Sequence, residues 1–230
     1  MLENFYNDLY LNFIKDDRWK YLTNGLLTTL QITFFAVLLG VFIGFIVAII
    51  RSTYDKTGKL KVLNAFAGLY LTVIRGTPVL VQLLIIYFGI FGSVNISKVL
   101  VAVVAFGINS GAYVAEIIRG GIMAIDQGQF EAGRSLGFNY IQTMIYIILP
   151  QALKNVLPAL ANEFIVLLKE TSVAGYIALE DLTKGGDIIR SRTYNAFLPL
   201  IAVALIYLSL VMIFSYFVKR LERRLRNSEH

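Results

Sequence analysis

The sequence contains no cysteine, and its one histidine, His230, is the last of its 230 residues. Disulfides, thiolate metal ligands and thiol nucleophiles are therefore excluded, and a lone terminal histidine argues against a histidine-based metal site or proton relay. Charged residues are also scarce, at 16% of the chain, against about 25% in soluble domains. This scarcity excludes an ordinary globular enzyme, a disordered chain and a nucleic-acid-binding module.

Apolar residues make up 57% of the chain and occur in long blocks. A helix that crosses a bilayer needs about 20 consecutive apolar residues. We therefore expect an all-α integral membrane protein with a single domain over residues 1–230 and about five transmembrane helices. The expected spans cover residues 25–50, 60–91, 96–118, 141–168 and 195–218.

The second block is interrupted by Arg75-Gly76-Thr77-Pro78. The pieces on either side, 62–74 and 79–91, are too short to cross a hydrocarbon core of about 30 Å at about 1.5 Å per residue. We expect one broken span or a span with a re-entrant half. Thr77 is the expected N-cap of the second half-helix, with Pro78 at its first position.

The net charge is +6, and the densest Lys/Arg clusters lie in 51–61 and in the tail from Lys219. Five spans place both clusters on one side of the membrane, which the positive-inside rule makes cytoplasmic. The N-terminus is then outside, the C-terminus and the 119–140 loop are cytoplasmic, and 169–194 is an outer loop. Apolar residues at three- and four-residue spacing predict an amphipathic interfacial helix over the first twenty residues; docking onto a partner is the alternative.

Catalytic patterns do not emerge from the sequence: it lacks a phosphate-binding G-x-x-x-x-G-K-[ST] loop, a G-x-S-x-G elbow and a hydrolytic carboxylate pair. What stands out is a polar segment, 127–140, between two hydrophobic blocks. Residues 129–136 are compatible with a short helix that Gly137 would end as its C′ residue. Such a helix suits a groove in another protein, although a solvated connecting loop would explain the composition too.

The run from Glu131 to Pro150 resembles the cytoplasmic loop of permease subunits of bacterial ABC importers. That pattern is E-A-A, three residues, G, nine residues and I-x-L-P, and it falls here on Glu131, Ala132, Gly133, Gly137, Ile147, Leu149 and Pro150. The one departure is Gly133, where the family usually has alanine; glycine weakens a helix by about 1 kcal/mol. Four further stretches resemble the polar amino-acid subgroup of histidine, glutamine and arginine permeases: 28–31, 75–78, 109–122 and 168–172.

The resemblance implies a complex of two permeases, identical or paralogous, two ATPases that bind ATP and Mg²⁺, and an external substrate-binding protein. The chain itself would need no cofactor and catalyse no reaction. Helix 127–137 would couple ATPase closure to alternating access of the spans, through Glu131, Ala132, Gly133 and Gly137. A secondary transporter is the rival interpretation, but it leaves the coupling pattern unexplained.

Polar residues inside the spans are candidates for binding an amino acid. Placing the Glu163 carboxylate at membrane depth costs roughly 3 kcal/mol of insertion free energy. We therefore expect it to bind a substrate ammonium or to pair with a cation such as Arg75. Asn109, at mid-span, and Gln82, one turn past Pro78, either touch substrate or join helices. Thr77 and Arg75, at the break, either bind a carboxylate or only accompany a kink.

Two expectations follow from these charges. Glu116 and Arg119, three residues apart, are predicted to form a local ion pair. The intramembrane carboxylate favours, slightly, a cationic substrate such as arginine, lysine or histidine over a neutral polar one such as glutamine.

Overall fold

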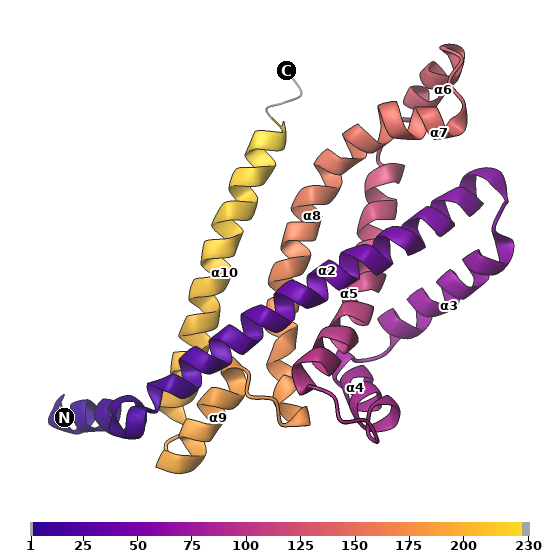
Figure 1. The fold of residues 1–230 in the computed structure, drawn as a ribbon. Helices are drawn as coiled ribbons and strands as arrows, with labels where there is room; N and C mark the ends of the chain where they lie inside the picture. Colours follow the sequence, from indigo (N-terminus) through magenta and orange to yellow (C-terminus); the bar gives the residue numbers. More distant parts are fainter. Residues whose placement is uncertain (1, 227–230) are drawn as a thin grey trace.

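The computed structural model describes residues 2–226, so Met1 and the C-terminal end with His230 lie outside the described chain. Within that range every regular element is helical, which confirms the all-α prediction (Figure 1). The elements are α1 (Leu2–Leu9), η1 (Tyr10–Ile14), η2 (Lys15–Asp17), α2 (Trp19–Thr57), α3 (Lys61–Gly76), α4 (Val79–Leu84), η3 (Ile85–Ile90), α5 (Lys98–Met123), α6 (Gln127–Ser135), α7 (Tyr140–Thr143), η4 (Met144–Ile148), α8 (Leu149–Glu170), η5 (Thr171–Ile177), α9 (Leu182–Thr193) and α10 (Phe197–Arg226).

Four continuous helical segments are long and apolar enough to cross a membrane: Trp19–Thr57, Lys98–Met123, Tyr140–Ile177 and Phe197–Leu225. The pair Lys61–Gly76 and Val79–Ile90 is apolar enough to count as a fifth span if it is taken as one, and its halves are bent by 109° at the break, as in a broken span or a re-entrant loop. The predicted interruption of the second block is thus confirmed. The first span is longer than expected, because α2 begins at Trp19 rather than at residue 25.

The centre of the bundle is the crossing of α2 and α5, where small residues let the two backbones approach closely. A Cβ added to Gly44 of α2 would lie 2.5 Å from Cγ1 of Val114 on α5. In the other direction, a Cβ on Gly107 of α5 would lie 2.7 Å from Leu39. This contact holds α5 in the interior, where most of its inner side chains are buried.

The expected outer loop 169–194 contains two helical elements, η5 and α9 (Figure 1). Asp181 begins α9 as its N-cap, accepting from the backbone N–H groups of Thr183 and Lys184 at 3.1 Å each. Gly185 packs against the backbone of α2, and Gly186 packs against Val203 of α10. This connection therefore contains a helix that the sequence did not predict: α9 packs against both the first and the last span.

The two ends of the bundle carry different features. Figure 1 shows the α2–α3 turn, α6 and the C-terminal end of α10 at one end, and α1 and α9 at the other. The two densest basic clusters therefore lie at the same end, as five spans require.

The N-terminal helix is present but shorter than predicted, because Asp16 and Asp17 leave the helical conformation, with φ of 56° and 53°. Its exposed side chains include Tyr6, Tyr10 and Ile14, whereas the side chains of residues 2–5 lie outside the description.

Candidate coupling helix and intramembrane polar site

The polar segment predicted to be a short helix folds as α6. Its N-cap is Asp126, whose Oδ1 accepts from the backbone N–H of Gly128 at 2.6 Å. At the other end the N–H of Phe138 donates to the carbonyl of Gly133 (3.1 Å) and that of Gly137 to Arg134 (2.9 Å). This pair of bonds, with Gly137 at φ +83°, is a Schellman cap. The prediction that Gly137 ends the helix is confirmed.

Gly133 is buried against the turn that follows α6 in the chain. A Cβ at this position would lie 2.7 Å from Cγ2 of Thr143 and 3.0 Å from Cδ1 of Ile147. The hydroxyl of Thr143 donates to the carbonyl of Asn139, which fixes the side chain that a methyl group would meet. The departure from alanine therefore has a packing reason: glycine lets α6 sit directly on α7 and η4.

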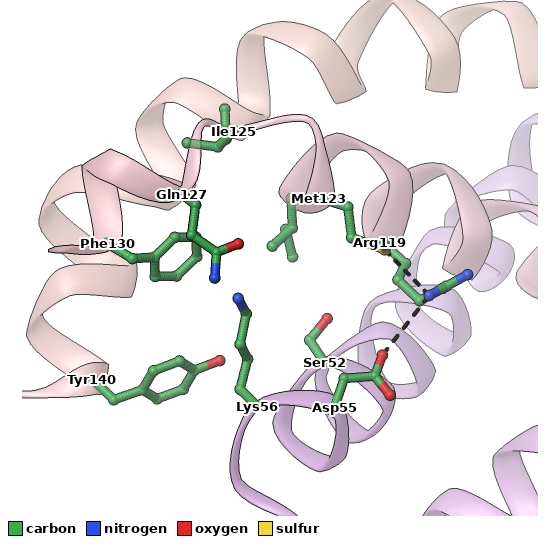
Figure 2. Close-up of a pocket in the computed structure, with 10 residues that line it drawn as sticks. Ser52, Asp55, Lys56, Arg119, Met123, Ile125, Gln127, Phe130 and Tyr140 are labelled. Carbon is green, nitrogen blue, oxygen red and sulfur yellow. Dashed lines mark hydrogen bonds and ion pairs between the residues drawn. The ribbon is translucent and has the colours of Figure 1, made fainter.

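The opposite side of α6 is open. Glu131, Ala132 and Arg134 are exposed, and Leu136, in the cap, is 73% exposed. On the inner side, a cavity of about 320 Å³ separates Phe130 from the ends of α2 and α5 (Figure 2). The helix thus contacts the spans through one side and presents the other to whatever lies beyond the basic end of the bundle.

A second group of functional candidates forms a hydrogen-bonded chain at the break between α3 and α4. The Nε2 of Gln82 donates to the carbonyl of Ile74 (2.7 Å) and to both the carbonyl and the hydroxyl of Thr77 (3.0 and 2.8 Å). Its Oε1 accepts from Nδ2 of Asn109 on α5 at 2.9 Å. Three candidates, Thr77, Gln82 and Asn109, are therefore brought together, and they connect the broken span to the buried helix.

The role expected for Thr77 as an N-cap was wrong. Pro78 is the residue that precedes α4, with extended backbone (ψ 136°), and Thr77 ends α3. Its hydroxyl donates backward to the carbonyl of Val73 at 2.8 Å while accepting from Gln82. Since proline has no N–H and fixes its own φ, it separates the two halves, and the Gln82 amide satisfies carbonyls that the break leaves without helical partners.

Glu163 of α8 is 8% exposed and meets α5 through a residue that the sequence did not single out. Its Oε1 accepts from the hydroxyl of Ser110 at 2.9 Å. Ser110 follows Asn109 directly, so α5 carries contacts to the Gln82 amide and to the Glu163 carboxylate from neighbouring positions. A hydroxyl beside a mid-span amide was the available signal for this partner.

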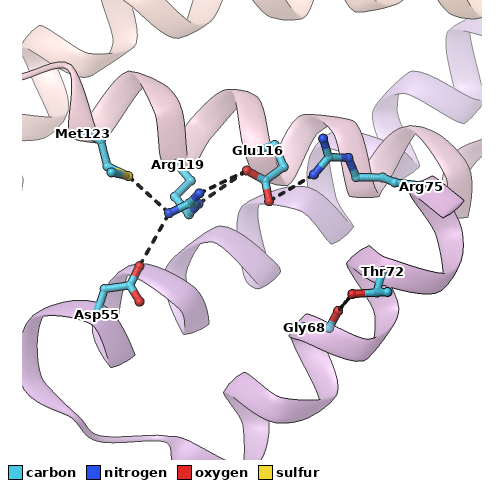
Figure 3. Close-up of polar contacts among 7 residues, drawn as sticks. All are labelled: Asp55, Gly68, Thr72, Arg75, Glu116, Arg119 and Met123. Carbon is cyan, nitrogen blue, oxygen red and sulfur yellow. Dashed lines mark hydrogen bonds and ion pairs between the residues drawn. The ribbon is translucent and has the colours of Figure 1, made fainter.

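Arg75 does not join Glu163 in the described chain. Its Nη1 lies 3.4 Å from Oε1 of Glu116, whose Oε2 lies 3.4 Å from Nη2 of Arg119 (Figure 3). Arg119 also reaches Asp55 at the end of α2, at 3.8 Å. The local Glu116–Arg119 pair is confirmed, and it is the middle of a longer chain of charges that joins α3, α5 and α2. These groups are partly exposed, so each pair contributes only about 0–1 kcal/mol.

Arg75, the cation suggested as the partner of Glu163, is therefore engaged with Glu116 instead. Arg75 is held toward the basic end of the bundle, where a cleft of about 490 Å³ is lined by Arg51, Arg75, Thr72 and Glu116 among others. Arg75 therefore does not pair with Glu163 in the part of the chain that the structure describes.

Comparisons with known proteins show which family the chain resembles. Residues 40–227 match the family described as binding-protein-dependent transport system inner membrane component. A putative glutamine transport system permease protein of Rickettsia typhi is 42% identical over 207 residues, covering 89% of this chain and 93% of that protein. The arginine transport system permease protein of Bacillus subtilis is 38% identical, with 91% and 94% covered.

Solved structures give the same result. A crystal structure of an amino acid ABC transporter with histidines has a TM-score of 0.83 and 47% identity, covering 89% of this chain and 94% of its own. The inward-facing methionine ABC transporter MetNI shares the fold at a TM-score of 0.78 and 21% identity, with 92% and 99% covered. The chain therefore belongs to the binding-protein-dependent transport system inner membrane components, and it is a permease of the amino-acid ABC importer type.

Proposed function

We propose that the chain is the transmembrane subunit of an ATP-driven importer that moves a polar L-amino acid across the bacterial cytoplasmic membrane by alternating access. The observation that carries the proposal is α6: a short helix with both ends capped, seated on the spans through Gly133 and exposed on its other side. It lies at the end of the bundle that holds the basic clusters, which we place in the cytoplasm. The N-terminus is then outside and the C-terminus cytoplasmic.

The partners follow from this arrangement. A dimer of ATP-binding cassette subunits, which holds ATP and Mg²⁺, receives the exposed side of α6, with Glu131, Ala132 and Gly137 shaping the contact. A second permease, identical or paralogous, completes the membrane pathway. An extracytoplasmic binding protein delivers the amino acid to the end formed by η5 and α9. Nucleic acid has no part in this function.

The proposed substrate site combines the buried side chains of Glu163, Asn109 and Gln82 with the exposed Thr77. The carboxylate accepts from an ammonium group, and the amides and hydroxyl supply further donors and acceptors. Arg75, tied to Glu116, would meet the substrate carboxylate on the cytoplasmic side of the break rather than beside Glu163. Because Arg75 does not pair with Glu163, the site favours a cationic substrate such as arginine, lysine or histidine.

A neutral polar substrate such as glutamine is the second candidate. It is favoured by the name of the Rickettsia typhi relative, and a carboxylate that binds only the α-ammonium would serve every amino acid. The arginine permease of Bacillus subtilis and the structure determined with histidines favour the cationic class.

In the proposed mechanism the chain moves as connected rigid parts. Closure of the ATPase dimer displaces α6, and the close contact of Gly133 with Thr143 carries this movement into η4 and α8. Glu163 lies on α8, so the same displacement changes its position against Ser110 of α5. The substrate site is thereby opened to one side or the other.

Uptake by the reconstituted complex tests the function. Proteoliposomes with the permease, its co-purified ATPase and the binding protein added outside should accumulate radiolabelled arginine only when ATP is enclosed inside the vesicles. Unlabelled lysine, histidine and glutamine as competitors then separate the cationic from the neutral class. Accumulation driven by an ion gradient without the ATPase would refute the proposal and identify a secondary transporter.

A further inference from the structure

A second cavity adjoins the one behind α6. The walls of the cavity behind α6 come from the ends of α2 and α5, from α6 and from the start of α7 (Figure 2). The second cavity, of about 240 Å³, lies between α2, α5 and the segment from α7 to α8. The two share the wall residues Ser52, Ile122 and Tyr140. They therefore adjoin each other along a common wall, and we call the two together the α2–α7 groove.

The chemistry of the groove changes along its length. Its outer end, beside α6, presents the polar groups of Lys56, Gln127, Ser52 and Tyr140, together with the ion pair of Asp55 and Arg119 (Figure 2). Its inner end is lined almost entirely by apolar side chains: Phe45, Ile49, Ile118, Ile122, Ile141, Met144, Ile145 and Leu149. Several of these apolar side chains, including Phe45, Ile49 and Ile145, are also exposed on the surface of the chain. A groove with one polar and one apolar end fits an amphipathic molecule.

The charges at the polar end select an anion. Arg119 is already engaged by Glu116 and Asp55. Lys56, in contrast, has no carboxylate within ion-pair distance among the residues that the structure describes. Its ammonium lies 4.4 Å from the centre of the Phe130 ring of α6, and Figure 2 shows it directed into the cavity toward Gln127. Lys56 is therefore the cation left available for a ligand.

We propose that the α2–α7 groove binds one anionic phospholipid of the cytoplasmic leaflet. Its phosphate contacts the Lys56 ammonium, with hydrogen bonds from Ser52, Gln127 and Tyr140, and an acyl chain follows the apolar end along Ile49 and Ile145. Basic pockets between helices at the cytoplasmic surface recognise anionic headgroups through the same charges. The choice of leaflet rests on the orientation proposed above, but the binding itself does not depend on transport.

The position gives the lipid a role in coupling. Lys56 belongs to α2, and the ring it touches belongs to α6, so a phosphate at this point contacts both the first span and the coupling helix. The apolar end meets η4, on which Gly133 of α6 rests. A bound lipid thus fills the joint through which α6 transmits its movement, and exchange of a charged for a neutral headgroup changes the stiffness of that joint.

Lipid retention tests the proposal. The full-length chain, purified with the subunits that accompany it, is placed in nanodiscs of phosphatidylcholine mixed with phosphatidylglycerol, and native mass spectrometry of the released complex measures retained phosphatidylglycerol. Lys56→Gln should weaken retention by about five-fold, the effect of one basic residue near a membrane surface. Lys59→Gln, in the same basic cluster but outside both cavities, is the matched control and should retain the lipid as wild type does.

Further arms identify the occupant. Ile145→Trp, at an exposed site, should narrow the apolar end and weaken lipid retention without changing Lys56. Soluble glycerol phosphate should fail to displace the lipid, and a photoreactive side chain at position 145 should cross-link to lipid. Equal retention by Lys56→Gln and Lys59→Gln, displacement by glycerol phosphate, or cross-linking to a second permease or an ATPase would each overturn the proposal. If the wild-type complex retains the lipid but does not take up arginine with ATP, the proposed function alone is refuted.

Discussion

Replacement of Glu163 by glutamine isolates the charge of the intramembrane site. The side chain keeps its volume, and its amide oxygen can still accept from the Ser110 hydroxyl, now 2.9 Å from the carboxylate. The helix contact between α5 and α8 should therefore survive. What disappears is the ionisable carboxylate of a side chain that is only 8% exposed and that Arg75 does not contact.

The expected loss is that of one charge-assisted hydrogen bond to an ammonium group, about 1.5–3 kcal/mol. This corresponds to roughly a ten- to hundred-fold weaker affinity. The assay is binding of arginine and of glutamine to the purified complex, wild type against Glu163→Gln. Ser110→Ala is the control, since it removes the hydrogen bond and keeps the charge, so it should weaken binding less.

The pattern of losses decides the role of Glu163. Selective loss of arginine binding would show that the carboxylate recognises a cationic side chain. Equal weakening of both ligands would place it on the α-ammonium instead. If arginine and glutamine both bind Glu163→Gln as tightly as the wild type, the reasoning is refuted and Glu163 is a structural partner of Ser110.

The remaining predictions concern the coupling helix and α9. Glu131→Lys and Gly137→Val should both abolish ATP-driven uptake while substrate binding persists. The first changes the exposed side of α6, and the second forces a β-branched residue to φ +83°. Uptake at wild-type rates by these variants would contradict the prediction. Gly133→Ala should lower stability by about 1–3 kcal/mol through overpacking, seen as a lower thermal midpoint, whereas Gly120→Ala, with nothing within 4 Å of its added Cβ, should not. Burial raises the pKa of Asp181 above 3.8, so the folded state retains a proton that the unfolded chain loses, and stability contributed by this group declines as pH rises from 3.8 through the raised pKa. Asp181→Asn, which still caps α9, should flatten that dependence in thermal unfolding across the acidic range, and an unchanged slope would exclude Asp181 as its source.

Features that depend only on residues close together in the chain were predictable from the sequence. Apolar block length fixed the spans, since a bilayer demands a minimum run of apolar residues. Proline and glycine fixed the break at Pro78 and the end of α6 at Gly137, because each constrains its own backbone. The Glu116–Arg119 pair followed from three-residue spacing on one helix.

The sequence did not predict α9, because this helix is stabilised by its packing against α2 and α10. Its sequence is polar and contains Gly185 and Gly186, which weaken an isolated helix. In the folded chain those glycines allow close packing between α2 and α10, and the buried Asp181 caps the first turn. A helix of this kind is visible only when the spans around it are in place.

The partners of the polar side chains were decided by tertiary structure alone. Arg75 and Glu163 are both charged and both lie in spans, so the sequence allowed them to pair, yet the bend at Thr77-Pro78 directs Arg75 to Glu116 and leaves Glu163 to Ser110. The same bend turned Thr77 from an expected helix cap into an acceptor for Gln82. Spacing along the chain determines which residues share a face of one helix, whereas the rotation, tilt and bending of neighbouring helices determine which faces meet.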